Sequence, residues 1–232
     1  MLLPRPLYPG TLVRRYQRFL ADVELDGGSI VTAHCPNSGS MKGCNLPGSP
    51  VLLSHSDKVD RKLRYTWELV MAEGNWVGIN TGLPNRLVRE GIENGVIIEL
   101  RGYPSIRPEV RYGEEKSRID LLLEAHSELC YVEVKNVTLV EGNLALFPDA
   151  VTTRGQKHLR ELMEVVRLGH RGVIFFVVQR SDGESVAPAD SIDAEYGRLL
   201  RLAAANGVEV LAYRASVSPD EVLLTHRLPV IL

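Results

Sequence analysis

Short segments in the first third of the chain alternate between apolar and polar residues, as half-buried β-strands do. Turn-forming residues separate these segments, for example at Asp26-Gly27-Gly28. The pattern predicts strands over residues 12–25, 29–33, 51–54, 63–71 and 75–80. Several short strands with turns between them are typical of a small antiparallel barrel or sandwich.

From about residue 83 the pattern changes to a mixture of helices and strands. A short helix is expected over residues 84–94, and three extended runs follow at 106–112, 118–123 and 130–137. The run 172–178 is continuously apolar, which indicates a central strand covered on both faces.

Two further helices are predicted in this second part. Apolar residues recur at helical spacing after Leu159, and Thr153 with Gln156 fits a capping box at the start of that helix. Asp193 is expected to cap the next helix, which precedes a buried strand at 208–213. Helices between strands predict an α/β fold with a mixed sheet, so we divide the chain into domains of residues 1–82 and 83–232.

The bulk composition changes this picture little. The chain has 232 residues, 44% of them hydrophobic, and a formal net charge of −2. Many nucleic-acid-binding proteins are strongly basic, so this charge argues mildly against that class, although local patches matter more. Neither a bilayer-spanning run nor a secretory signal is evident. We therefore expect a cytoplasmic protein without membrane association, in which Cys35, Cys44 and Cys130 are reduced thiols.

The residues that point to chemistry lie on two neighbouring predicted strands. Glu133 and Lys135 are two positions apart, so their side chains share one face of a strand. Asp120 is on the preceding strand, and a hairpin can bring it beside Glu133. Paired carboxylates on an apolar strand lose solvation and repel each other, and a cation such as Mg²⁺ relieves both costs. We favour this metal site over the alternative, a structural ion pair with Lys135.

The start of the following helix adds basic and polar side chains. Arg154, Gln156 and Lys157 can hold a phosphate there, because the free N–H groups and dipole of a helix start attract anions. The alternative is that Gln156 only closes the capping box and that the basic residues are solvated. His158 is expected on the helix surface.

A basic and aromatic stretch lies in the predicted barrel. It consists of Arg14, Arg15, Tyr16 and Arg18, followed by Phe19. OB barrels bind single strands by stacking bases on aromatic side chains above a basic groove, so we expect the first four residues to contact nucleic acid. The alternative is that Phe19 is part of the core and the arginines are solvated.

Six motifs stand out along the chain. They are RRYQRFL at 14–20, HCPNSGSM at 34–41, SRID at 117–120, YVEVKNVTL at 131–139, FPDAV at 147–151 and RGQKHL at 154–159. Together they resemble the sugar fermentation stimulation protein (SfsA) family over nearly the whole chain. The resemblance implies an N-terminal OB-like barrel followed by a PD-(D/E)xK nuclease-like α/β domain.

The same resemblance implies roles for individual residues. Asp120 corresponds to the strand aspartate, Glu133 and Lys135 to the E-x-K pair, and Gln156 to the polar residue of the following helix. The acidic residue that such folds carry on their first helix corresponds to Glu90 rather than Glu93, with Glu109 as a competing carboxylate.

The resemblance also implies DNA, single- or double-stranded, as the partner, and a link to the regulation of sugar (maltose) metabolism. We expect a DNA-binding protein with a phosphodiesterase site whose Mg²⁺ or Mn²⁺ is held by Asp120, Glu133 and Glu90. The alternatives are a non-catalytic DNA-binding transcriptional regulator and a protein that acts on RNA or a nucleotide rather than DNA. The sequence leaves the oligomeric state open, with a homodimer as one option.

Overall fold

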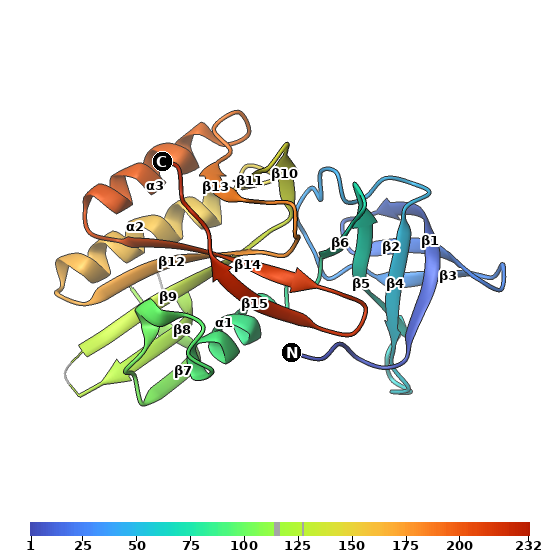
Figure 1. Cartoon of the computed structure of the whole chain (residues 1–232), viewed down its shortest axis with the longest axis horizontal. Coiled ribbons are helices and arrows are strands. Elements are labelled where there is room, and N and C mark those ends of the chain that lie inside the picture. The colour runs from blue at the N-terminus through green and yellow to red at the C-terminus, as the bar shows by residue number, and fades with distance from the viewer. Residues whose placement is uncertain (114–116, 127) are drawn as a thin grey trace.

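In the computed structural model the chain forms a β-barrel beside a larger α/β domain (Figure 1). The structure describes residues 1–113, 117–126 and 128–232. None of the helices among these residues is long and apolar enough to cross a membrane.

The barrel contains all the strands predicted in the first third of the chain. They are β1 (Leu7–Tyr16), β2 (Leu20–Leu25), β3 (Ile30–His34), β4 (Pro50–His55), β5 (Tyr65–Ala72) and β6 (Asn75–Gly78). They are ordered β3-β2-β1-β4-β5-β6, and a pairing of β3 with β5 closes the first five into a barrel. The one long segment expected at 12–25 is in fact a hairpin, because Gln17 and Arg18 adopt positive φ angles and turn the chain.

The second domain is an α/β fold with a mixed sheet, as predicted. Its elements are α1 (Pro84–Glu93), η1 (Ile98–Leu100), β7 (Ser105–Tyr112), β8 (Ser117–Ala125), β9 (Glu128–Val137), β10 (Leu139–Glu141), β11 (Leu144–Phe147), α2 (Thr153–Arg167), β12 (Arg171–Val178), β13 (Ser185–Pro188), α3 (Ala194–Ala205), β14 (Glu209–Val217) and β15 (Val222–Arg227). The main sheet has the order β15-β14-β12-β9-β8-β7, with β9, β12 and β14 parallel. The short strands β10, β11 and β13, which the sequence pattern did not predict, form a small separate sheet.

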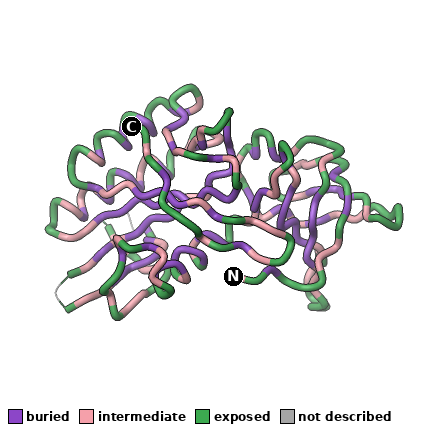
Figure 2. Tube along the Cα trace, in the orientation of Figure 1, coloured by how far each residue is buried: buried purple, intermediate pink, exposed green. Residues whose placement is uncertain are grey.

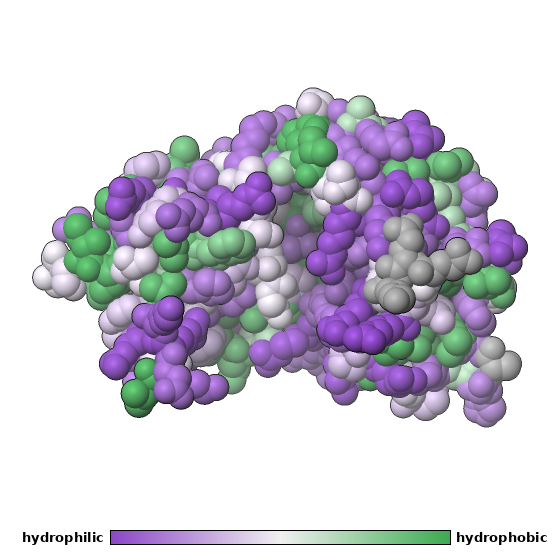
Figure 3. Space-filling model, turned by 180° about the vertical axis from the view of Figure 1, so that it is seen from behind, coloured by the Kyte–Doolittle hydropathy of each residue, from purple (hydrophilic) through white to green (hydrophobic). Residues whose placement is uncertain are grey.

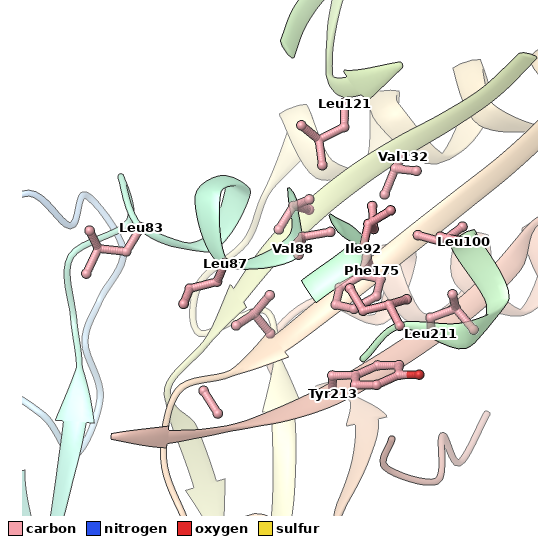
Figure 4. Close-up of a cluster of buried hydrophobic side chains, with 14 of the residues drawn as sticks. Leu83, Leu87, Val88, Ile92, Leu100, Leu121, Val132, Phe175, Leu211 and Tyr213 are labelled. Carbon is pink, nitrogen blue, oxygen red and sulfur yellow. The ribbon is translucent and has the colours of Figure 1, made fainter. Parts of the chain in front are cut away.

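Apolar side chains cover both faces of the main sheet, and its central strands are largely buried (Figure 2). Strand β12 shows why: Val173, Phe175 and Val177 face one core, and the residues between them face the other. Helix α1 packs on the first face with Leu87, Val88 and Ile92 (Figure 4). Helices α2 and α3 pack on the opposite face. The predicted central strand, covered on both sides, is therefore confirmed.

The start of helix α2 differs in detail from the prediction. The N-cap is Thr152, whose side chain accepts a hydrogen bond from the Gly155 backbone N–H at 3.0 Å. Gln156 does not close a capping box with Thr153. Its amide instead donates to Asp193, the N-cap of α3, at 2.9 and 3.1 Å. Asp193 is thus a cap as predicted, and it also joins the two helices.

The two domains contact each other at both ends of the barrel. The first three residues, which a division at residue 82 assigns to the barrel, cross to the second domain, where Leu3 joins its core and the Met1 amino group donates to Val222 O. At the other end, the Gly78 N–H donates to Gln179 O at 3.0 Å. The Arg180 guanidinium lies 2.8 Å from Glu73 Oε2. These contacts fix the barrel against the edge of the α/β domain.

Candidate functional site

Asp120, Glu133 and Lys135 lie together in one cavity, as their strand positions suggested. The β8–β9 ladder pairs residues from Ala125–Glu128 up to Leu121–Val132. At the next position, the Asp120 side chain takes over from the backbone. Its Oδ2 accepts a hydrogen bond from the Val134 backbone N–H at 2.7 Å. A mid-strand aspartate is therefore held beside the strand that carries Glu133.

Asp120 has a second partner on α1. Its Oδ1 accepts from Asn85 Nδ2 at 2.8 Å. Burial and the nearby Glu133 carboxylate raise the pKa of Asp120 to about 6, although both hydrogen bonds favour the ionised form. Hydrogen bonds to both oxygens thus hold the Asp120 carboxylate in place, but the positive charge nearby does not offset burial and the charge of Glu133.

Glu133 is the most buried member of the site, with 2% of its surface exposed. Its Oε1 lies 2.6 Å from Lys135 Nζ and also contacts His158 Nδ1. Burial opposes ionisation, but Lys135 and His158 outweigh it and hold the pKa of Glu133 below its usual range. Among the described residues, Oε2 is buried without a hydrogen-bond partner.

His158 connects this carboxylate to the helix start. Its Nε2 accepts from Arg154 Nε at 3.4 Å, so the network assigns a proton on Nδ1 that is donated to Glu133. His158 is buried, with 3% exposed, which corrects its expected place on the helix surface. It fixes the carboxylate, while Arg154 lines the cavity.

The carboxylate pair fits a divalent cation of the magnesium type. Such cations keep several waters and need only one or two protein carboxylates. The unpartnered Glu133 Oε2 and the raised pKa of Asp120 are both signs of missing positive charge. Within the described ranges, no three His, Cys, Asp or Glu side chains are grouped to form a fuller metal cage.

A cavity of about 790 Å³ surrounds these groups, and residues of both domains line it. Figure 3 shows the molecule from behind, where it is hollowed between the barrel and the α/β domain. The barrel contributes Arg15, Arg18 and residues 37–40, and the second domain contributes the carboxylates, Lys135 and Arg154. The site is therefore completed by the barrel.

Asp149 holds the barrel loop that forms this wall. Its Oδ2 accepts from the Met41 N–H at 2.7 Å, and its backbone oxygen accepts from Ser40 Oγ at 2.6 Å. Gly39 lies so close to this carboxylate that an added Cβ would be 2.7 Å from Asp149 Oδ1. From the barrel side, Arg15 donates to the backbone oxygens of Asn37, Gly39 and Ser40. Arg15 thus has a structural role in holding this loop, and its contact with nucleic acid stays a prediction.

The structure does not bring all the predicted residues to this cavity. Gln156 is turned toward Asp193, and Glu90 pairs with the Met1 amino group at 3.1 Å. Neither lines the cavity, so the structure does not support Gln156 as a catalytic residue or Glu90 as a metal ligand. Glu109, the competing carboxylate, does line it, from a position in β7 between the residues paired with Leu121 and Ile119.

Only some of the predicted basic and phosphate-binding residues line the cavity. Arg18 and Arg154 line the cavity, whereas Arg14, Tyr16 and Lys157 do not. Arg14 and Tyr16 instead share Asp22 as a partner, with Arg14 Nε at 2.8 Å and the Tyr16 hydroxyl at 3.1 Å.

The sequence alone did not identify three residues that help to form the site, namely His158, Asn85 and Asp149. His158 follows Arg154 by four residues, a spacing that places them on one helix face. Asp149 lies inside one of the motifs that carried the family resemblance, which was its only signal. Asn85 showed no pattern that distinguished it from an ordinary helix-start residue.

Comparisons with known proteins agree with this architecture. Residues 82–221 match the family model described as the sugar fermentation stimulation protein RE domain, and residues 13–79 match the SfsA N-terminal OB domain. A sugar fermentation stimulation protein homolog from Geobacter metallireducens is 77% identical over 232 residues, all of both chains. One from a Shewanella species is 54% identical over 97% of each chain. A solved structure of Pyrococcus furiosus SfsA in complex with Ca²⁺ superposes with a TM-score of 0.90 at 30% identity, covering 100% of this chain and 98% of that one.

Proposed function

The chain belongs to the sugar fermentation stimulation protein family, and we propose that it is a DNA-binding protein with a divalent-metal-dependent phosphodiesterase site. The observation that carries this proposal is the buried Glu133 Oε2, which lacks a partner among the described residues and lies in the same cavity as Asp120. Basic side chains line the same cavity, as a phosphate-binding site requires.

We assign the cation to Asp120 and Glu133, with waters completing its coordination. Glu109 lines the cavity, unlike Glu90, but it is not grouped with these two carboxylates as a third ligand. The Pyrococcus furiosus relative was solved with Ca²⁺, which supports a divalent cation, and Mg²⁺ or Mn²⁺ are the cations we propose for this chain. When bound, such a cation supplies a Lewis acid that polarises a phosphate oxygen and lowers the pKa of a bound water.

The residues of the chain would supply orientation and charge. Lys135 presents an ammonium group that can neutralise charge growing on the phosphate during hydrolysis. Hydrolysis forms a bond between a water oxygen and phosphorus and breaks the bond to the leaving sugar oxygen. Water gives up one proton, and the leaving oxygen gains one. His158 acts as a positioning residue, because its contact with Oε1 leaves Oε2 of Glu133 directed elsewhere.

Cleavage of labelled DNA tests the proposal. Wild-type protein with Mg²⁺ or Mn²⁺ should cut DNA, and a chelator should stop it. Glu133→Gln and Lys135→Met should each lower the rate at least about a hundredfold, since each removes charge at the reacting phosphate. Glu164→Gln, an exposed carboxylate on α2 outside the cavity, is the matched control and should cut at the wild-type rate. Undiminished cutting by Glu133→Gln and Lys135→Met would contradict the assignment.

A non-catalytic DNA-binding regulator is the second candidate. The observation in its favour is that no three potential ligands are grouped for a metal among the described residues. The same assay separates the two candidates. DNA binding by wild type without turnover in either metal would support the regulator and overturn the nuclease.

A further inference from the structure

The cavity that holds the carboxylates has walls from two domains, and this restricts what can reach them. We infer that the site takes a single strand of DNA, held by Arg18 of the barrel and Arg154 of the α/β domain. This inference rests on the proposed function, because it names the form of DNA on which the proposed site acts.

The depth of the carboxylates is the first argument. Glu133 is 98% covered, so a phosphate must enter the cavity to approach it. A volume of about 790 Å³ is in the range of pockets that enclose small ligands. A duplex is normally contacted by protein elements that enter its grooves, and enzymes that act on a base inside a pocket take a single strand or an extruded nucleotide. A phosphate must likewise enter this cavity, and one strand is narrower than a duplex. We therefore expect the cavity to take a segment of one strand rather than a duplex.

The second argument is that hydrogen bonds and close contacts hold the barrel wall of the cavity against the second domain. Asp149 holds the barrel loop at Ser40 and Met41. Gly78 is so close to the second domain that an added Cβ would lie 2.3 Å from Gln179 Oε1. The residues at the start of the chain hold the barrel from its other end. Opening the cavity to the width of a duplex would break contacts at both ends of the barrel.

Arg18 provides the third argument. It lies in the β1–β2 turn with a φ angle of 64°, a left-handed conformation that is unfavourable for a non-glycine residue. The Arg15 guanidinium holds this turn by donating to the backbone oxygen of Arg18 at 2.9 Å. The Arg18 side chain lines the cavity, and no partner for its guanidinium occurs in the described part of the chain. Glu109, with a φ of 55°, is a second left-handed residue on the cavity wall.

The charges of the lining indicate when a strand can bind. The described lining contains four basic side chains, Arg15, Arg18, Lys135 and Arg154, and four acidic ones, Glu109, Asp120, Glu133 and Asp149. These charges balance, so the lining alone does not attract a polyanion. A divalent cation makes the cavity net positive, and binding of a strand should therefore depend on the cation.

Three substrates of one sequence test the inference: the single strand, its full duplex, and a strand paired over only half its length. With Mn²⁺, the single strand should be cut at least about tenfold faster than the duplex, because a duplex must first unpair and unstack. Cuts in the half-paired substrate should be confined to its unpaired part. Equal or faster cutting of the duplex overturns the inference and leaves the proposed nuclease intact.

Binding with Ca²⁺ instead of Mn²⁺ provides a readout that does not need cleavage. Wild type should bind the single strand more tightly than the duplex, and only when the cation is present. If no substrate is cut in Mn²⁺, the proposed nuclease fails, and this binding comparison alone decides the strand preference. Equal binding of both forms, or binding that ignores the cation, would overturn the inference.

Arg18→Ala tests the barrel wall, with Lys62→Ala as the matched control. The Arg15 bond goes to the backbone oxygen of Arg18, so truncating the side chain leaves the turn in place. Loss of one phosphate contact should flatten the salt dependence of single-strand binding by about 0.7 in the log–log slope. Lys62 is an exposed barrel residue outside the cavity, and its truncation should leave the slope unchanged. Equal slopes for Arg18→Ala and wild type would remove Arg18 from the site.

Discussion

At the scale of single residues, the site depends on a few charged groups in unusual surroundings. The two-residue spacing of Glu133 and Lys135 predicted that they share a face, and Oε1 of the glutamate lies 2.6 Å from the lysine Nζ. The role of His158 could not be predicted, because helical spacing places it beside Arg154 without showing which face is buried. Asn85 was missed for a similar reason, since its partner Asp120 is 35 positions away.

The pKa of Asp120 gives a prediction for the metal-free protein. Folding raises this pKa from 3.8 to about 6, so the folded state favours the protonated carboxyl. The contribution of Asp120 to stability is therefore greatest below the unfolded-state pKa and is lost as the pH rises through about 6. Asp120→Asn should remove this dependence and become about 3 kcal/mol more stable than wild type above that pH, at 1.4 kcal/mol per pKa unit.

Urea unfolding in a chelator across this pH range measures the effect. The two proteins should have similar free energies of unfolding near pH 4 and separate as the pH rises. A constant difference between them would show that Asp120 is not destabilised by burial.

At the scale of elements, most helices and strands followed from the hydrophobic pattern. The continuous run at 172–178 is the central strand β12, because apolar residues on both of its faces are covered. The small sheet was not predicted, since β10, β11 and β13 are too short for a periodic signal. The helix after residue 152 was predicted with the wrong cap. Gln156 was assigned to the site from its place at the helix start and from the family resemblance, neither of which shows its hydrogen bond to Asp193.

Asp193 joins α2 and α3, which predicts a graded set of stabilities. The Asp193 carboxylate accepts from the N–H groups of Thr152 and Tyr196 and from the amide of Gln156. Asp193→Ala should cost about 3 kcal/mol, since it removes a cap and leaves buried donors unpaired. Gln156→Ala should cost about 1 kcal/mol, as a single hydrogen bond does.

Denaturant unfolding gives these values, and Glu195→Ala in the first turn of α3 is the control, expected within about 0.5 kcal/mol of wild type. The DNA cleavage rate of Gln156→Ala should equal that of wild type. A large loss of rate without a loss of stability would return Gln156 to the catalytic site.

At the scale of the whole molecule, the arrangement of the two domains forms the cavity. The sequence predicted a barrel followed by an α/β domain, but it did not predict how the barrel reaches the site. The contact of Asp149 with Met41 spans 108 positions and follows no periodic pattern. Such contacts depend on tertiary packing, which local propensity does not encode.

Diffraction from crystals of the full chain soaked in Mn²⁺, recorded at a wavelength where manganese scatters anomalously, tests whether the carboxylate pair holds a metal. We predict an anomalous peak between the carboxylates of Asp120 and Glu133 in the wild-type protein, and its loss in Glu133→Gln. No peak there at saturating Mn²⁺, or an equal peak in both proteins, would contradict the proposed metal site.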